Sequence, residues 1–113
     1  MKARELAPEQ KGLELLIKVE EKTETREVTS SSDDKFHRVC EALVGDETGC
    51  VYLSLWDERI DELKEREYYK ISKAYTTVYK HSLRLNIGRY GKIQEAEGTF
   101  EIDTSNNLSL KEL

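Results

Sequence analysis

The chain has 113 residues, of which 36% are charged and 37% apolar, and its formal net charge is −5. This length allows one domain with a modest core, and no apolar run approaches the roughly 18 residues of a membrane-spanning helix. The start of the chain lacks the uninterrupted apolar stretch of a secretory signal, so we expect an intracellular protein.

The N-terminal part of the chain predicts one clear strand and one irregular strand. Residues 1–12 hold the only proline and form a lead-in, and apolar residues then alternate along 13–20, which predicts a strand that can continue to residue 28. The polar run "TSSSDDK" at 29–35 predicts a loop. Residues 36–44 are rich in β-forming residues, but the apolar ones fall in two phases, which predicts a strand with a bulge.

The run "GDETG" at 45–49 has a glycine at each end and predicts a turn between two strands. A turn over these residues places Cys50 beside Val44 and Cys40 beside Ser54. The two cysteines are then not cross-strand partners, and we expect no disulfide between them.

The run "CVYLSLWDE" at 50–58 predicts a strand whose two sides differ in character, because side chains alternate between the faces of a strand. One side is aliphatic and forms the expected core side: Val51, Leu53 and Leu55. The other side holds Tyr52, Ser54 and Trp56. The only tryptophan of the chain is therefore expected to face away from the core, either as a binding residue or beneath a cover such as the tail around Phe100.

Residues 66–80 predict a strand whose core phase changes partway along its length. Tyr69 lies in one phase, and Thr76 and Val78 lie in the other. The change falls within residues 72–74 and predicts a bulge or a strand break there. After this change, two tyrosines are expected on the outward side, Tyr75 and Tyr79.

The remaining elements complete a recognisable order. Residues 58–65 predict a helix of about two turns, because Ile60 and Leu63 lie three residues apart. Residues 82–88 predict a last strand with Arg84 and Asn86 on its outward side. Three strands, a helix and two strands are the order of an OB-fold, a partly open Greek-key barrel. We therefore expect an all-β protein with a five-stranded OB-fold domain over residues 13–95, and a C-terminal extension over 96–113 that adds a strand or stays loose.

The expected outward residues are aromatic and basic. Residues 66–93 hold seven Lys and Arg residues and one acidic residue, a net charge of +6, which leaves −11 on the remainder of the chain. Aromatic rings stack on bases and cations neutralise phosphates, so this combination favours binding of single-stranded nucleic acid. The alternative is a solvated pair of strands rich in lysine, with the tyrosines present only because strands favour them.

Other chemistry has little support in the sequence. His37 and His81 lie 44 residues apart, with no Cys or His at metal-ligand spacing, so we expect no metal. No candidate base accompanies the serines at 30–32, and the glycines at 88 and 91 lack the rest of a phosphate-binding loop. We expect no catalytic residue, no cofactor and no enzymatic activity.

Two runs of the sequence, "EALVGDETGCVYLSLWDE" and "ISKAYTTVYKHSLRLNIGRYGKI", resemble the single-domain OB-fold single-stranded DNA-binding proteins of archaea. They also resemble the eukaryotic relatives of that family, which include the DNA-binding subunit of the sensor-of-single-stranded-DNA complex. The resemblance covers about residues 6–95, and the "NNLSL" ending looks like plant and other eukaryotic relatives. It implies a cytoplasmic location in an archaeon, and a nuclear or cytoplasmic one in a eukaryote.

The resemblance also implies roles for individual residues. In that family, aromatic residues at the positions of Trp56, Tyr75 and Tyr79 stack on bases. Some relatives have a fourth aromatic residue where this chain has Asn86, whose amide is expected to contact a base edge instead. The loop from about Arg26 to Lys35 contacts the strand in relatives, so these two residues are expected contacts.

These observations predict a protein that binds single-stranded DNA with little sequence preference and acts in replication or repair. One alternative is a module that binds single-stranded RNA, because stacking and phosphate contacts do not by themselves exclude RNA. Another is a subunit that uses the aromatic face to dock a protein partner. The candidate binding residues are Trp56, Tyr75, Tyr79, Arg84, Asn86, Arg89, Lys80, Tyr52, Lys35 and Arg26.

Overall fold

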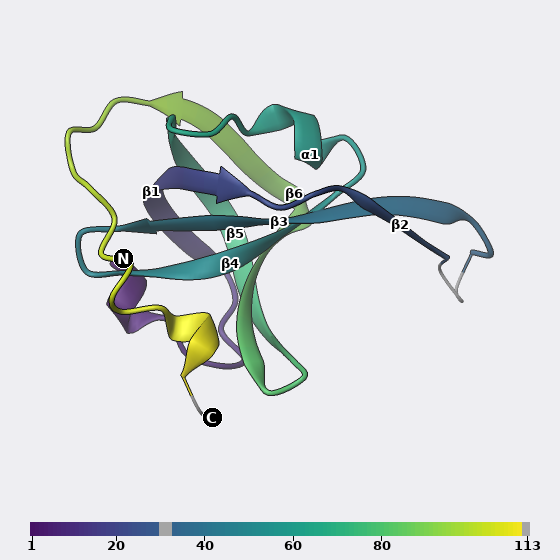
Figure 1. Cartoon of the computed structure of the whole chain (residues 1–113), viewed down its shortest axis with the longest axis horizontal. Coiled ribbons are helices and arrows are strands. Elements are labelled where there is room, and N and C mark those ends of the chain that lie inside the picture. The colour runs from purple at the N-terminus through teal and green to yellow at the C-terminus, as the bar shows by residue number, and fades with distance from the viewer. Residues whose placement is uncertain (30–32, 112–113) are drawn as a thin grey trace.

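The computed structural model describes residues 1–29 and 33–111, so the predicted loop at 29–35 lies partly outside the described residues. The described part of the chain contains six strands, one short α-helix and two 3-10 helices (Figure 1). In chain order these are η1 (Ala3–Glu5), β1 (Leu13–Lys22), β2 (Arg26–Thr29), β3 (Phe36–Asp46), β4 (Gly49–Trp56), α1 (Arg59–Glu62), β5 (Tyr68–Tyr79), β6 (Ser82–Ala96) and η2 (Leu108–Leu110).

Five strands pair in a circuit that closes on itself. The order is β1–β5–β6–β4–β3, and β3 pairs again with β1. These neighbours are antiparallel except for β4 and β6, which run parallel and pair only over residues 52–54 and 84–86. This short seam leaves the barrel partly open, and the circuit confirms the predicted OB-fold.

The sixth strand, β2, arises where the first strand was predicted to continue. Thr23 separates β1 from β2 because it is held against β3: its N–H donates to the Glu41 carbonyl over 2.8 Å, and its Oγ1 accepts from the Glu41 N–H over 2.9 Å. β2 then pairs with the first half of β3 and forms an arm that extends from the barrel (Figure 1).

The predicted strand phases place the core correctly. Val51, Leu53 and Leu55 are each at most 1% exposed, and the opposite side of β4 faces outward. The predicted phase change of β5 is also confirmed, since Lys73 takes a φ of 54° at a register shift between β5 and β6. The prediction that Val78 joins the core is wrong: it is 48% exposed because the β5–β6 hairpin extends past the end of the barrel (Figure 1).

The second apolar phase of β3 does not come from the predicted bulge. β3 pairs with β4 from Val39 to Asp46 without a register shift. Val39 is 3% exposed on the outward side, where its cross-strand partner is Trp56. At this point β3 is buried on both faces, with Cys40 on the core side and Val39 on the outward side, so apolar residues occur in both phases.

The turn between β3 and β4 is shorter than predicted, since Asp46 pairs directly with Gly49. The cross-strand partner of Cys50 is therefore Gly45 rather than Val44, and the partner of Cys40 is Leu55 rather than Ser54. Both cysteines are free and buried, as the predicted absence of a disulfide between them requires. Burial raises the pKa of the Cys50 thiol to about 11.

The helix α1 is one turn long rather than two, although Ile60 and Leu63 are both buried as predicted. Residues outside the helix form hydrogen bonds with the backbone groups at its C-terminal end. The Nζ of Lys22 donates to the carbonyls of Ile60 and Leu63 over 2.7 and 2.9 Å, and the N–H of Lys64 donates to the Tyr69 hydroxyl. These contacts satisfy the groups that a second turn would have used.

The described part of the C-terminal extension neither adds a strand at 99–102 nor stays loose. It leaves β6, passes along the barrel and ends in η2, beside β4 and β6 (Figure 1). The Asn106 carbonyl accepts from the Cys50 N–H over 2.9 Å, and Leu108 and Ser109 are buried. Phe100 packs edge-on against Tyr68 with ring centroids 5.0 Å apart, so it does not cover Trp56.

Candidate nucleic-acid interface

The strand register collects most of the candidate residues on one surface, which we call the outward face. Cross-strand partners lie side by side on the same face of a sheet. One row crosses β2, β3 and β4 with Arg26, Val39 and Trp56. A second row of cross-strand partners consists of Glu41 on β3, Ser54 on β4, Asn86 on β6 and Tyr75 on β5. A third holds Leu43, Tyr52, Arg84 and Thr77, and Tyr79 lies beyond it opposite Ser82.

Three aromatic rings on this face are open to solvent. Trp56 is 46% exposed, Tyr75 is 36% exposed and Tyr79 is 51% exposed. Trp56 and Tyr79 are the last residues of β4 and β5, and Tyr75 lies within β5 opposite Asn86. Rings in this position have a free π-face, which is the group that stacks on a nucleobase.

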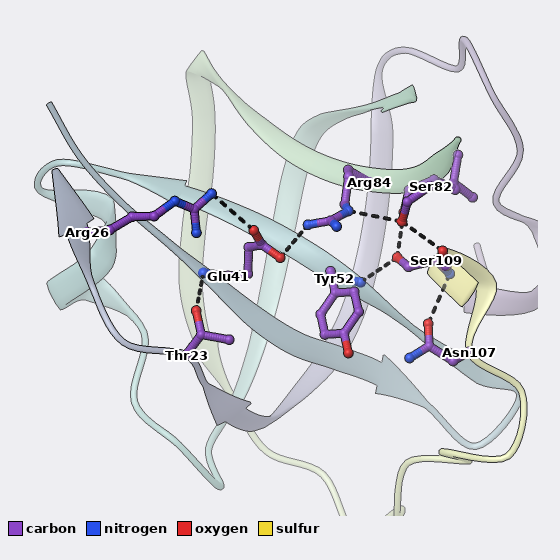
Figure 2. Close-up of polar contacts among 9 residues, drawn as sticks. Thr23, Arg26, Glu41, Tyr52, Ser82, Arg84, Asn107 and Ser109 are labelled. Carbon is purple, nitrogen blue, oxygen red and sulfur yellow. Dashed lines mark hydrogen bonds and ion pairs between the residues drawn. The ribbon is translucent and has the colours of Figure 1, made fainter. Parts of the chain in front are cut away.

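Arg84 lies at the centre of the outward face in a polar network (Figure 2). Its Nη1 pairs with a carboxylate oxygen of Glu41, and its Nε donates to the Ser82 hydroxyl over 3.1 Å. The guanidinium also lies 5.2 Å from the ring centroid of Tyr52 and 5.7 Å from that of Tyr79. Arg84 is thus a fixed, largely covered cation rather than a freely moving one.

Arg26 and Tyr52 belong to the same network, and Asn86 is held by a separate contact. Arg26 donates from Nη2 to Glu41 over 3.4 Å, so one carboxylate bridges two arginines (Figure 2). Asn86 is only 9% exposed, and its amide nitrogen donates to the Thr77 hydroxyl over 2.9 Å. Tyr52 is half-buried beneath Arg84. Asn86 therefore lies on the outward side of β6, as predicted, but its side chain is largely covered there.

Lys80 occupies the tip of the β5–β6 hairpin. Lys80 and His81 both take positive φ, 50° and 65°, as the two-residue turns of tight hairpins require. Glycine or asparagine is the usual residue at such positions. The Nζ of Lys80 lies 5.3 Å from the ring centroid of Tyr79, so an exposed cation lies beside the outermost ring.

Arg89 projects from an irregular stretch of β6. The pairing with β5 jumps from Ile87 to Lys92, and Arg59 of α1 fixes the intervening backbone by donating to the carbonyls of Gly88 and Gly91 over 3.3 and 2.7 Å. A Cβ on Gly91 would lie 2.4 Å from the Ile87 side chain, so only glycine fits there.

The structure does not bring Lys35 together with the central candidates. It lies in the connection between β2 and β3, at the end of the arm that extends from the barrel, and its N–H donates to the Asp33 carboxylate.

The cations of the basic segment 66–93 do not all lie on the outward face. Lys70 pairs with Glu14 of β1 over 2.9 Å and Arg66 pairs with Glu20 over 3.7 Å, both away from that face.

Sequence reasoning missed several residues of this surface. Glu41 gave no signal, because a lone acidic residue in a strand is usually only solvated. Tyr90 is 74% exposed beside Arg89, at a position where no alternation pattern applied. His37 lies between two carboxylates, with Nδ1 2.8 Å from Asp57 and Nε2 2.9 Å from Asp33, and these hydrogen bonds raise the pKa of its imidazole.

The described part of the chain also bears on membrane and metal sites. Over residues 1–29 and 33–111, no helix is long and apolar enough to cross a membrane. In the same part of the chain, no group of three or more His, Cys, Asp or Glu side chains is arranged to hold a metal ion.

Comparison with known proteins gives consistent matches. Residues 6–95 match the family model described as single-stranded DNA binding protein Ssb-like, OB fold. The single-stranded DNA binding protein Ssb of Saccharolobus solfataricus is 36% identical over 91 residues, which cover 80% of this chain. The chain spans 60% of the length of that relative.

Two solved structures have the same fold. A hypothetical protein from Arabidopsis thaliana is 29% identical, with a TM-score of 0.82 over 99% of this chain and 83% of its own. The second OB-fold domain of replication protein A from Methanococcus maripaludis has a TM-score of 0.69 over 89% of this chain and 98% of its own, at 22% identity. At that identity the likeness to the second structure is one of fold.

Proposed function

The chain belongs to the Ssb-like OB-fold family of single-stranded DNA-binding proteins, and from this premise we propose that it binds single-stranded DNA through the outward face. One observation carries the proposal. Trp56, Tyr75 and Tyr79 are between 36% and 51% exposed on the same face of the barrel. Stacking contributes about 1–3 kcal/mol per base, so three rings supply much of the binding free energy.

The proposed binding depends little on base sequence. Every base has a π-face, so stacking on the three rings does not distinguish among bases. Asn86 is the polar side chain placed to read a base edge, but its amide nitrogen already donates to Thr77. Lys80 beside the Tyr79 ring and Arg89 on the irregular stretch of β6 are exposed cations that supply contacts to phosphates, which carry no sequence information.

We extend the proposal to the setting of the protein. The archaeal relative is a single-stranded DNA-binding protein by name, and the domain from Methanococcus maripaludis belongs to replication protein A. The name of the archaeal relative supports a role in protecting exposed single strands during replication or repair, and we place this role inside the cell and without catalytic turnover.

Fluorescence of Trp56 provides the test. The protein is titrated with oligothymidylate and with oligouridylate of matched length, with the indole as the reporter. Oligothymidylate is expected to quench the fluorescence, with an occluded site of roughly 4–16 nucleotides. If oligouridylate binds more tightly than oligothymidylate, the preferred ligand is single-stranded RNA and not single-stranded DNA. Failure of both oligomers to bind in a label-free calorimetric titration would overturn the proposal and leave a protein-docking face as the alternative.

A further inference from the structure

A hollow of about 540 Å³ lies at one end of the outward face. Its volume is within the range of roughly 300–1,000 Å³ that is usual for small-ligand sites. Its lining comes from three segments: Tyr52 of β4, residues 80–82 and Arg84 of the β5–β6 hairpin, and residues 109–111 of the C-terminal segment. The hollow therefore exists only because the C-terminal segment lies against the barrel.

Ser109 attaches this segment at the open seam of the barrel. It is 2% exposed, and its hydroxyl accepts from the Tyr52 N–H over 2.9 Å and donates to the Leu83 carbonyl (Figure 2). The hydroxyl thus bridges β4 and β6 where their short parallel pairing begins. Asn107 fixes the same residue by accepting from its N–H over 2.9 Å. The wall of the hollow is an integral part of the barrel seam.

The C-terminal segment also positions Arg84. The Ser82 hydroxyl donates to the Ser109 carbonyl over 2.7 Å and accepts from Nε of Arg84 over 3.1 Å. Figure 2 shows the resulting chain of contacts from the C-terminal segment through Ser82 and Arg84 to Glu41. The guanidinium is therefore fixed from both sides at the entrance of the hollow.

The lining has the chemistry of a nucleotide site. Lys80 and Lys111 bring two exposed cations, Arg84 brings a third that is paired with Glu41, and the lining residues that the structure describes include no carboxylate. Tyr52 and Leu110, which is 72% exposed, supply apolar surface for a sugar or a base. Tyr79, the outermost ring of the outward face, is in contact distance of both Lys80 and Arg84, so the hollow continues the proposed path of the strand.

We propose that this hollow is a subsite for one further nucleotide of the bound strand, with the phosphate held between Lys80 and Lys111. The inference rests on the proposed function and adds the C-terminal segment to the binding surface. The phosphate is either an internal phosphodiester or the terminal phosphate of a strand, since both present the same anionic oxygens to these cations.

Charge reversal at Lys111 tests the subsite, with Lys64→Glu as the matched control. Both lysines are exposed, but Lys64 follows α1 at the other end of the barrel. Calorimetric titrations with oligothymidylates are made over a range of salt concentrations. Lys111→Glu is expected to weaken binding several-fold and to reduce the slope of log K against log salt by about 0.7, the value of one phosphate contact on a single strand. Lys64→Glu is expected to match the wild type.

Oligomers with a 5′-phosphate, a 3′-phosphate or neither distinguish the two sources of the phosphate. A gain in affinity from one terminal phosphate that Lys111→Glu removes identifies a strand end. A loss in Lys111→Glu that is the same for all three oligomers identifies an internal phosphodiester. Equal affinities and slopes for wild type, Lys111→Glu and Lys64→Glu would overturn the subsite while leaving the proposed function in place. Failure of the wild type to bind any oligomer would instead overturn the proposed function.

Discussion

Arg84 of β6 and Glu41 of β3 form an ion pair across the outward side of β4, and only 15% and 16% of their side chains are exposed. Glu41 pairs with Arg26 as well, over 3.4 Å. One carboxylate therefore neutralises two arginines in the middle of a face that we propose binds a polyanion. A phosphate that approaches either guanidinium competes with Glu41.

The first prediction concerns this competition. Glu41→Gln keeps the shape of the side chain but removes its charge, so the two arginines become available to phosphates. We expect the slope of log K against log salt for oligothymidylate to steepen by about 0.7 for each arginine released. The measurement is a salt series of calorimetric titrations, with Glu97→Gln as a control that removes the same charge from an exposed position beyond the end of β6. An unchanged slope would show that neither arginine contacts a phosphate.

Local alternation in the sequence predicts much of this face but not its connections. Strand phase alone placed Trp56, Tyr75 and Tyr79 outward, because side-chain direction in a strand follows from a period of two. Phase does not say which distant strands become neighbours. The Arg84–Glu41 pair joins residues 43 apart, and the contact between Ser109 and Tyr52 joins residues 57 apart. Such contacts are set by the barrel topology.

The errors in prediction have related causes. Val78 lies on the core side of β5, as its position in the alternation predicted. The strand extends beyond the end of the barrel, however, so Val78 has no core to pack against and is exposed. The helix α1 ends early because Lys22 of β1 takes its carbonyls, a long-range contact that has no local signal. Residues 103–111 are held by hydrogen bonds and by Leu108, a single leucine that joins the core, so hydrophobic periodicity did not reveal them.

The second prediction is a pH dependence of stability that comes from His37. Hydrogen bonds to Asp57 and Asp33 raise the pKa of His37 above its ordinary value of 6.5. The charged form therefore stabilises the folded state below the unfolded pKa, and this contribution is lost as pH rises through the folded pKa. The thermal midpoint of wild type relative to His37→Gln is expected to be higher at about pH 5.5 than at about pH 9. A difference that stays constant over this range would show that His37 is not charged in the folded state.

The third prediction is that the pure protein does not cleave nucleic acid. This prediction rests on the proposed function, which is to bind a strand and leave it unchanged, and on the family of single-stranded DNA-binding proteins to which the chain belongs. Labelled single strands incubated with the protein and Mg²⁺ are expected to stay intact on a denaturing gel. Cleavage that disappears when Asp33 or Asp57 is changed to Asn would contradict the proposal of a binding protein without turnover.

The fourth prediction concerns the three exposed rings. Trp56→Ala, Tyr75→Ala and Tyr79→Ala are each expected to weaken single-strand binding by about 1–3 kcal/mol, roughly 5- to 150-fold, because each removes a stacking surface. Phenylalanine at either tyrosine is expected to retain most of the affinity, since the ring and not the hydroxyl stacks on the base. Calorimetric titration with oligothymidylate measures the change for every variant, including Trp56→Ala, which has no indole to report.

Melting curves of the same variants separate binding from folding. The rings are more than a third exposed, so their removal is expected to change the thermal midpoint little. Leu53→Ala is the control from the opposite side of β4: Leu53 is 0% exposed, and its truncation is expected to cost about 2–5 kcal/mol of stability through the cavity left behind. Binding by the folded fraction of that variant is expected to match the wild type. If the three ring variants instead melt far below the wild type but bind normally when folded, the rings support the barrel and the strand binds elsewhere.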